Sequence, residues 1–142
     1  MLINRRQIEI QWGDCDAAGT VFLPRYLEYG DACTNTLFAK AGLFKPVLLK
    51  TYNIIGIPVV DLHVQLLVPS DFGDELVYET CIPEWGRSSF RVQHKVFKAD
   101  GALGLEILEK RVWVRRLCEQ PAKFSSEPIP QEVKLRFNGL GY

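Results

Sequence analysis

Two carboxylates, a thiol and a glycine lie close together in Gly13–Pro24, near the start of this 142-residue chain. The segment joins a short strand-like stretch to the one long helical pattern of the sequence. The first N–H groups of a helix lack partners within the helix, and the helix dipole favours negative charge there. Such a terminus can hold an oxygen that becomes negative in a transition state. An acidic side chain just before it could act as nucleophile or general base.

Asp14 and Asp16 are the two carboxylates that could take this role. Because aspartate also favours turns and helix entries, a structural role stands beside the catalytic one, and we expect it for Asp14. Cys15 has no His or Lys near it in the sequence to activate its thiol, so we interpret it as a packing residue. His63 and His94 fall within strand patterns and are assigned no catalytic role.

A helix is predicted from about Pro24 to Ala41, with Gly42 just past its end as a left-handed cap. Apolar and small residues cover more than half of its circumference, which predicts an embedded helix. Gly30 weakens a helix interior by about 1 kcal/mol against Ala, and close approach to a sheet or a ligand would account for it. Asp31 either faces water, pairs with an Arg, or lines a ligand pocket.

Alternating or β-prone stretches follow the helix and predict several strands joined by turns. Including the stretch before the helix, the predicted strands are 7–12, 54–68, 75–85, 88–97 and 102–117. In the first of them Ile8, Ile10 and Trp12 are predicted to face inward. Strands that follow a single helix favour an α+β fold with an antiparallel sheet curled around that helix. One side of the sheet would stay apolar, so we expect other subunits to cover it.

Length and composition predict a single domain over residues 1–142. Lys plus Arg and Asp plus Glu balance at 17 each, which argues against nucleic-acid binding. No apolar run approaches the roughly 20 residues that cross a bilayer, and the first residues lack the apolar core of a secretory signal. The four cysteines are scattered, so we expect reduced thiols, no metal site and a cytoplasmic location.

Three motifs together resemble one family. Trp12-Gly13-Asp14-Cys15-Asp16, continuing through Gly19 into a Pro-x-Tyr helix, resembles the hot-dog-fold thioesterases of the Pseudomonas 4-hydroxybenzoyl-CoA type. The turn at 67–74 and the segment 84–90 with nearby His94 are similar to later parts of the same family. The similarity runs from Ile8 to about Pro130.

The resemblance implies a long central helix wrapped by a five-stranded antiparallel sheet. It implies that two subunits form one continuous sheet, that such dimers pair into tetramers, and that active sites lie at the dimer interface. The reaction it implies is hydrolysis of an acyl-CoA thioester to a free acid and CoA, with no cofactor. Asp16 would attack the thioester or deprotonate water. An Asp with a pKa of about 3.9 is ionised at neutral pH, which favours attack.

The resemblance also implies roles for individual residues. The catalytic set would be Asp16, Gly19 and the backbone N–H of Leu23. The acyl group would meet Asp31, Ile57 and Pro58. The CoA phosphates would meet Arg87, Ser88, Ser89 and Lys123.

Some positions depart from the family pattern. Gly86 and Ser88 stand where relatives are basic, and Ile57 stands where a hydroxyl residue would help bind a phenol. The pocket is therefore expected to be somewhat more apolar than one built for 4-hydroxybenzoyl. Benzoyl-type, substituted aryl and medium acyl groups all stay open, with aromatic acyl-CoA as the leading substrate class. An acyl-carrier-protein thioesterase and a non-catalytic acyl-CoA binding protein are the alternatives.

Overall fold

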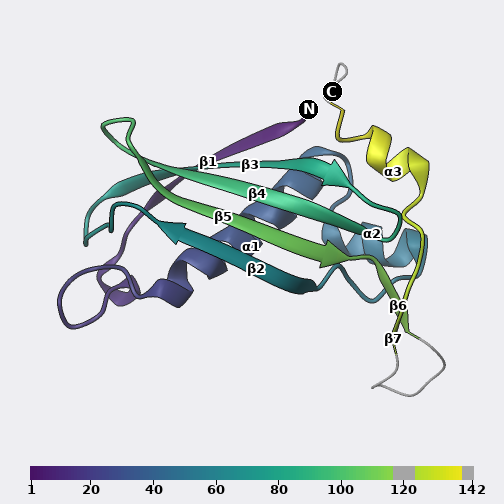
Figure 1. Ribbon diagram of the computed structural model, residues 1–142, viewed down its shortest axis with the longest axis horizontal. Coiled ribbons are helices and arrows are strands. Elements are labelled where there is room, and N and C mark those ends of the chain that lie inside the picture. Colours follow the sequence, from purple (N-terminus) through teal and green to yellow (C-terminus); the bar gives the residue numbers. More distant parts are fainter. Residues whose placement is uncertain (117–123, 139–142) are drawn as a thin grey trace.

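One long helix, α1 (Leu23–Lys40), lies across one face of a five-stranded antiparallel sheet in the computed structural model (Figure 1). The structure describes residues 1–116 and 124–138. The strand order is β1-β3-β4-β5-β2, and the strands are β1 (Ile3–Glu9), β2 (Val59–Leu66), β3 (Glu75–Trp85), β4 (Ser89–Lys98) and β5 (Leu103–Val112). This confirms the predicted α+β architecture with its central helix.

Smaller elements complete the chain around this sheet. They are the 3-10 helix η1 (Trp12–Asp14), α2 (Lys45–Tyr52), the strands β6 (Val114–Arg116) and β7 (Phe124–Ser126), and α3 (Gln131–Leu135). Strands β6 and β7 pair with each other as a separate antiparallel ribbon. Within the described ranges, no helix combines the length and the apolar character needed to cross a membrane.

Helix α1 ends as its sequence predicts. Gly42 adopts a left-handed backbone with φ of 83°. Its N–H donates to the carbonyl of Ala39 at 3.0 Å, and the N–H of Leu43 donates to that of Phe38 at 2.8 Å. These two bonds satisfy carbonyls that the helix itself leaves open, and they turn the chain towards α2.

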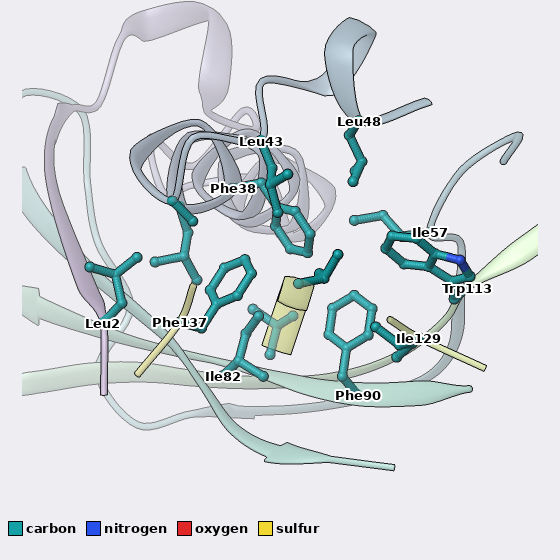
Figure 2. Packing of buried hydrophobic residues seen from close by; sticks show 14 of the residues in the cluster. Leu2, Phe38, Leu43, Leu48, Ile57, Ile82, Phe90, Trp113, Ile129 and Phe137 are labelled. Carbon is teal, nitrogen blue, oxygen red and sulfur yellow. The ribbon is translucent and has the colours of Figure 1, made fainter. Parts of the chain in front are cut away.

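The core fills the space between α1 and the concave face of the sheet. Figure 2 shows Phe38 of α1 facing Phe90 and Ile82 of the sheet, with Phe137 beside it. The Phe38 ring lies 4.8 Å from that of Phe137 and 5.8 Å from that of Phe90, measured between centroids. Aromatic pairs in such tilted and edge-on geometry add to the stabilisation from burial. Trp113 is also buried in this cluster (Figure 2).

Three sequence-based predictions about strands need correction. Trp12 is not inward-facing: β1 ends at Glu9, and Trp12 lies in η1 with 64% of its surface exposed and its ring edge-on to Phe72. The predicted strand 102–117 is divided at Trp113, whose N–H donates to Ser88 instead of continuing the ladder. The predicted strand 54–68 is shorter, Val59–Leu66, because Gly56 and Pro58 interrupt the pattern before it.

The outer face of the sheet is more polar than predicted. One row across it places Arg5, Glu79, Lys95 and Glu106 side by side, so that charges of opposite sign alternate. Such cross-strand pairs suit a face in water. Six of the fourteen large apolar side chains left exposed among the described residues lie on the edge strand β2 and the turn after it, at Val59, Val60, Leu62, Leu66, Leu67 and Val68.

Two Gly→Ala substitutions should have opposite effects on stability. A methyl group on Gly30 would lie 3.5 Å from the His94 ring and 3.7 Å from Ile107, which are ordinary contacts. Gly30→Ala should therefore raise the free energy of unfolding by about 0.5–1 kcal/mol. Gly42→Ala should lower it by about 1 kcal/mol, because an L-residue is strained at that positive φ. Urea unfolding of both variants tests this, and a destabilised Gly30→Ala protein would contradict this spacing between α1 and the sheet.

Candidate functional site

The loop before α1 is a tight hairpin, and Asp16 is the first residue of its turn. The Asp16 N–H donates to the carbonyl of Thr20 at 2.9 Å, and the Gly19 N–H donates to that of Asp16 at 3.0 Å. Gly19 has φ of 82°, a conformation that Gly adopts without strain. Cys15 and Val21 pair below this turn in a short antiparallel bridge. The predicted catalytic residues Asp16 and Gly19 are thus fixed at the two ends of one turn.

The carboxylate of Asp16 is exposed and bonded only to neutral donors. Its Oδ1 accepts from the Ala18 N–H at 2.9 Å, and the Thr20 hydroxyl lies 3.2 Å from both carboxylate oxygens. Among the described residues, no cationic side chain lies within ion-pair distance of it. An ionised carboxylate in this setting can act as a nucleophile or accept a proton from water.

The backbone N–H of Leu23 lies at the start of α1, on the same loop. Phe22 is the N-cap, with an extended backbone, and its own N–H donates to the carbonyl of Asp14 at 2.9 Å. Leu23 is the first helical residue, so its N–H has no acceptor within the helix, and within the described ranges no other hydrogen bond uses it. Pro24 follows and has no N–H. This end of α1 therefore offers the Leu23 N–H to an external oxygen.

Asp14 and Cys15 support this loop, as the sequence suggested. The Asp14 carboxylate accepts from the Gln11 N–H at 3.0 Å and from the Tyr29 hydroxyl. Burial, together with this hydrogen bond, raises the pKa of Tyr29, which stays a neutral donor. Burial and the nearby carboxylates of Asp14 and Asp16 raise the pKa of the Cys15 thiol, which disfavours the nucleophilic thiolate.

A cavity of about 390 Å³ lies farther along α1, beside the start of β2. It is lined by Asp31, Lys45, Ile55, Gly56, Ile57, Pro58, Val59, Arg111 and Val114. The structure therefore brings together the three residues predicted to meet the acyl group, Asp31, Ile57 and Pro58. Sequence reasoning missed Arg111 and Lys45. Arg111 stands at an inward position of a strand, and an inward Arg is a signal that the sequence did carry.

Arg111 is buried, and its guanidinium is held from three directions. Its Nη1 donates to the Ile57 carbonyl at 3.0 Å, and its Nη2 donates to Asp31 at 2.9 Å and to Glu109 at 2.8 Å. Asp31 thus pairs with an Arg and lines a cavity at once, which joins two of the interpretations left open by the sequence. More than half of the Asp31 side chain is exposed, whereas Glu109 and Arg111 are almost fully enclosed.

His94 and Glu109 continue this polar network beneath α1. The His94 Nε2 lies 2.6 Å from Glu109, and its Nδ1 lies 2.8 Å from the Thr80 hydroxyl. Burial by itself raises the pKa of Glu109, but the hydrogen bond from His94 and the charge of Arg111 outweigh it and lower that pKa below its usual value. His94 is hydrogen-bonded on both ring nitrogens, as expected of a structural histidine. No group of three or more His, Cys, Asp or Glu side chains suited to a metal ion occurs in the described parts of the chain.

Three of the four residues predicted to bind CoA lie at the β3–β4 turn. Arg87 is exposed, Ser88 and Ser89 are partly buried, and the Gly86 N–H closes the turn on the Ser89 carbonyl at 2.7 Å. Lys123 lies outside the described residues. In Figure 1 this turn and the Asp16 loop lie at opposite ends of the sheet. Helix α1, with 18 residues and a length of about 27 Å, begins at the Asp16 loop. Because the loop and the turn lie at opposite ends of the sheet (Figure 1), one chain does not gather them into one site.

Comparison with known proteins places this geometry in a family. A model of the thioesterase-like superfamily matches residues 10–137. The chain belongs to this superfamily. It is 37% identical over 92 residues to 4-hydroxybenzoyl-CoA thioesterase of Pseudomonas sp. strain CBS-3, a stretch that covers 63% of this chain and 64% of that relative's length.

Solved structures extend the similarity to nearly the whole chain. The solved three-dimensional structure of the same Pseudomonas enzyme superposes with a TM-score of 0.87 and 29% identity, over 96% of this chain and 99% of that one. A gentisyl-coenzyme A thioesterase superposes with a TM-score of 0.78 and 29% identity, over 94% and 98% of the two chains. The fold is therefore the hot-dog fold that the sequence resemblance implied.

The buried Glu109 should make stability depend on pH. Because its folded pKa lies below the ordinary value of 4.5, its ionised form stabilises the fold above that pH, and this contribution is lost as the pH falls through the folded pKa. Glu109→Gln should lower the free energy of unfolding by about 3 kcal/mol at neutral pH, since Arg111 loses a buried counter-charge. The difference from the wild type should shrink below pH 4.5. Chemical unfolding of both proteins at acidic and at neutral pH measures it, and a constant difference would contradict an ionised Glu109.

Proposed function

We propose that this protein hydrolyses an acyl-CoA thioester, with an aromatic acyl group as the leading substrate class. The observation that carries the proposal is that the exposed Asp16 carboxylate lies on the loop that leads into the open Leu23 N–H at the start of α1, in a member of the thioesterase-like superfamily. Support for the aromatic class comes from two relatives, named for 4-hydroxybenzoyl-CoA and gentisyl-CoA.

The chemistry follows from these two groups. The Leu23 N–H and the helix dipole polarise the thioester carbonyl and stabilise the negative oxygen that forms when it is attacked. In one route Asp16 attacks the carbonyl carbon, the C–S bond breaks, CoA leaves as a thiolate, and water then hydrolyses the mixed anhydride. In the other route Asp16 takes a proton from the water that attacks. Gly19 keeps the turn free of a side chain where the thioester would approach.

The cavity beside Asp31, Ile57 and Pro58 is the proposed acyl pocket. Its volume of about 390 Å³ suits a substituted ring, and apart from Asp31, Lys45 and Arg111 its lining side chains are apolar. Arg87, Ser88, Ser89 and Lys123 are proposed to meet the CoA phosphates. No cofactor takes part in this scheme.

A second copy of the chain would complete the site. The edge strand β2 exposes apolar side chains and unpaired backbone groups, a combination suited to pairing with another β2. We propose a dimer with one sheet continuous across it, and pairing of dimers into a tetramer. A second subunit could bring its Arg87 turn or acyl cavity towards Asp16, groups that lie apart within one chain. The free thiols of Cys15, Cys33 and Cys81 suit the proposed cytoplasmic location.

Replacement of Asp16 should abolish turnover. Asp16→Ala is expected to lower kcat at least about 100-fold, the scale of a lost base or nucleophile. Free-thiol release from benzoyl-, 4-hydroxybenzoyl-, phenylacetyl- and straight-chain acyl-CoA measures it. Asp100→Ala is a matched control, because Asp100 makes the same bond to the N–H two residues on, at 2.9 Å, in a different turn.

The outcomes separate the candidate functions. Substantial release by a folded Asp16→Ala protein would refute the role of Asp16. If the wild type releases no thiol from any ester, either acyl-carrier-protein substrates or a binding protein remain. A titration with acyl-CoA and an assay with acylated carrier protein then distinguish the two.

A charge on β2 should prevent pairing. Leu66→Lys places an ammonium group on the exposed edge strand, where a second β2 would have to cover it. Because burying an unpaired charge is costly, the variant should shift the protein towards monomer. Leu135→Lys on α3 is the control, since Leu135 is exposed to a similar degree, 49% against 46% for Leu66. Analytical ultracentrifugation measures the fraction of monomer in both variants. A Leu66→Lys protein that associates as strongly as the control would place the interface elsewhere.

A further inference from the structure

Arg111 is unusual among the cavity-lining residues because it is charged and nearly fully buried. It is 4% exposed, and it lines both the 390 Å³ cavity and a neighbouring one of about 140 Å³ under α1. Three of the five N–H groups of a guanidinium are occupied, by Ile57, Asp31 and Glu109. The buried Nε has no partner in the described part of the chain. Nothing in the hydrolytic scheme above uses this side chain.

Asp31 reaches the cavity as half of an ion pair. Its Oδ1 is taken by Arg111, and among the described residues no protein donor bonds its Oδ2. The bond from Arg111 holds Oδ1 and leaves Oδ2 as the acceptor for a ligand. A carboxylate held in this way recognises a hydrogen-bond donor at a defined place, whereas a free carboxylate would turn towards water.

Glu109 affects the strength of the electrostatic attraction between Arg111 and Asp31, because it bonds the same guanidinium nitrogen. It is 5% exposed and bonds Arg111 at 2.8 Å, while Thr34 of α1 and His94 of β4 hold its other oxygen. Without Glu109, Asp31 would be the only carboxylate left to balance a buried guanidinium. Asp31 would then be drawn towards Arg111 and away from the acyl group. With Glu109 present, two carboxylates share the charge of Arg111, and Asp31 stays available to the cavity. Although Lys45 also lines the cavity, a group placed against Oδ2 meets Asp31 first: a neutral donor finds an acceptor there, whereas an anion meets a like charge.

We propose that Arg111 determines acyl specificity in this pocket and that Glu109 is the positioning residue that sets it. Together they orient Asp31 to accept a hydrogen bond from a neutral donor, such as a ring hydroxyl, and to disfavour a carboxylate at the same place. This inference rests on the proposed thioesterase function. It assigns to two buried side chains a selectivity that Asp31 alone would not have.

Hydrolysis of three esters that differ only at the para position tests the inference. Benzoyl-CoA, 4-hydroxybenzoyl-CoA and 4-carboxybenzoyl-CoA are compared by kcat/KM. The wild type should prefer the hydroxyl ester at least about tenfold over each of the others. In Glu109→Gln, and in Arg111→Lys, the hydroxyl-to-benzoyl ratio should fall about tenfold, mainly through KM, while thermal melting confirms folding.

Glu106→Gln provides the matched control. Glu106 lies on the same strand, β5, but on the outer face, where it bonds Gln93 at 3.0 Å, so the same chemical change should leave the ratio unaltered. Equal losses on all esters in the folded Glu109→Gln and Arg111→Lys proteins would show a merely structural role and overturn the inference. So would a wild type with no preference among the three esters, whether or not the variants fold.

Failure of the function and failure of the inference can be told apart. Turnover without the expected selectivity overturns the inference and leaves the thioesterase intact. If no ester is hydrolysed, the proposed function fails. Calorimetric titration of the wild type and both variants with the same three esters then measures the selectivity as a ratio of Kd values. Equal Kd values for the three esters in the wild type would overturn the inference.

Discussion

A buried set of charges between α1 and the sheet constrains the rest of this structure. Glu109 bonds Thr34 of α1, His94 of β4 and Arg111 of β5, and Arg111 returns to Asp31 of α1. Removing ions from water is costly unless each finds well-placed partners, so these contacts fix the depth and rotation of the helix against the strands. The wall of the cavity beside Asp31 and the start of α1 then follow from where that helix lies.

Helix α1 serves the fold and the site with different parts of its length. Its C-terminal half packs Leu37 and Phe38 into the larger apolar cluster. Its middle carries Gly30 against His94, and Asp31 at the cavity. Its first residue presents an open N–H beside the Asp16 turn. Because both lie along one rigid helix, α1 sets the distance between the Asp16 turn and the cavity beside Asp31. Loops would leave that distance variable.

Much of the fold was predictable because local signals agreed with it. Pro24 and Gly42 marked the helix ends within one residue, and the alternation through Glu75–Trp85 gave the bounds of β3. The errors fell where tertiary contacts override local pattern, as at Trp113, whose ring is buried in the core and whose N–H leaves the ladder for Ser88. At the site, sequence motifs pointed to Asp16 and Asp31. The role of Arg111 at the cavity was not predicted, because its partners lie up to 80 residues away in the chain.

The two edges of the sheet differ in a way that limits growth. The β1 edge exposes Arg5, Arg6, Gln7 and Glu9, whereas the β2 edge is largely apolar. Charged edges resist strand addition. If two β2 strands paired, both apolar edges would be covered. The two edges of the combined sheet would then be the charged β1 strands. An association through the proposed β2 edge would therefore end at a closed pair, because the charged β1 edges would resist open-ended β polymerisation.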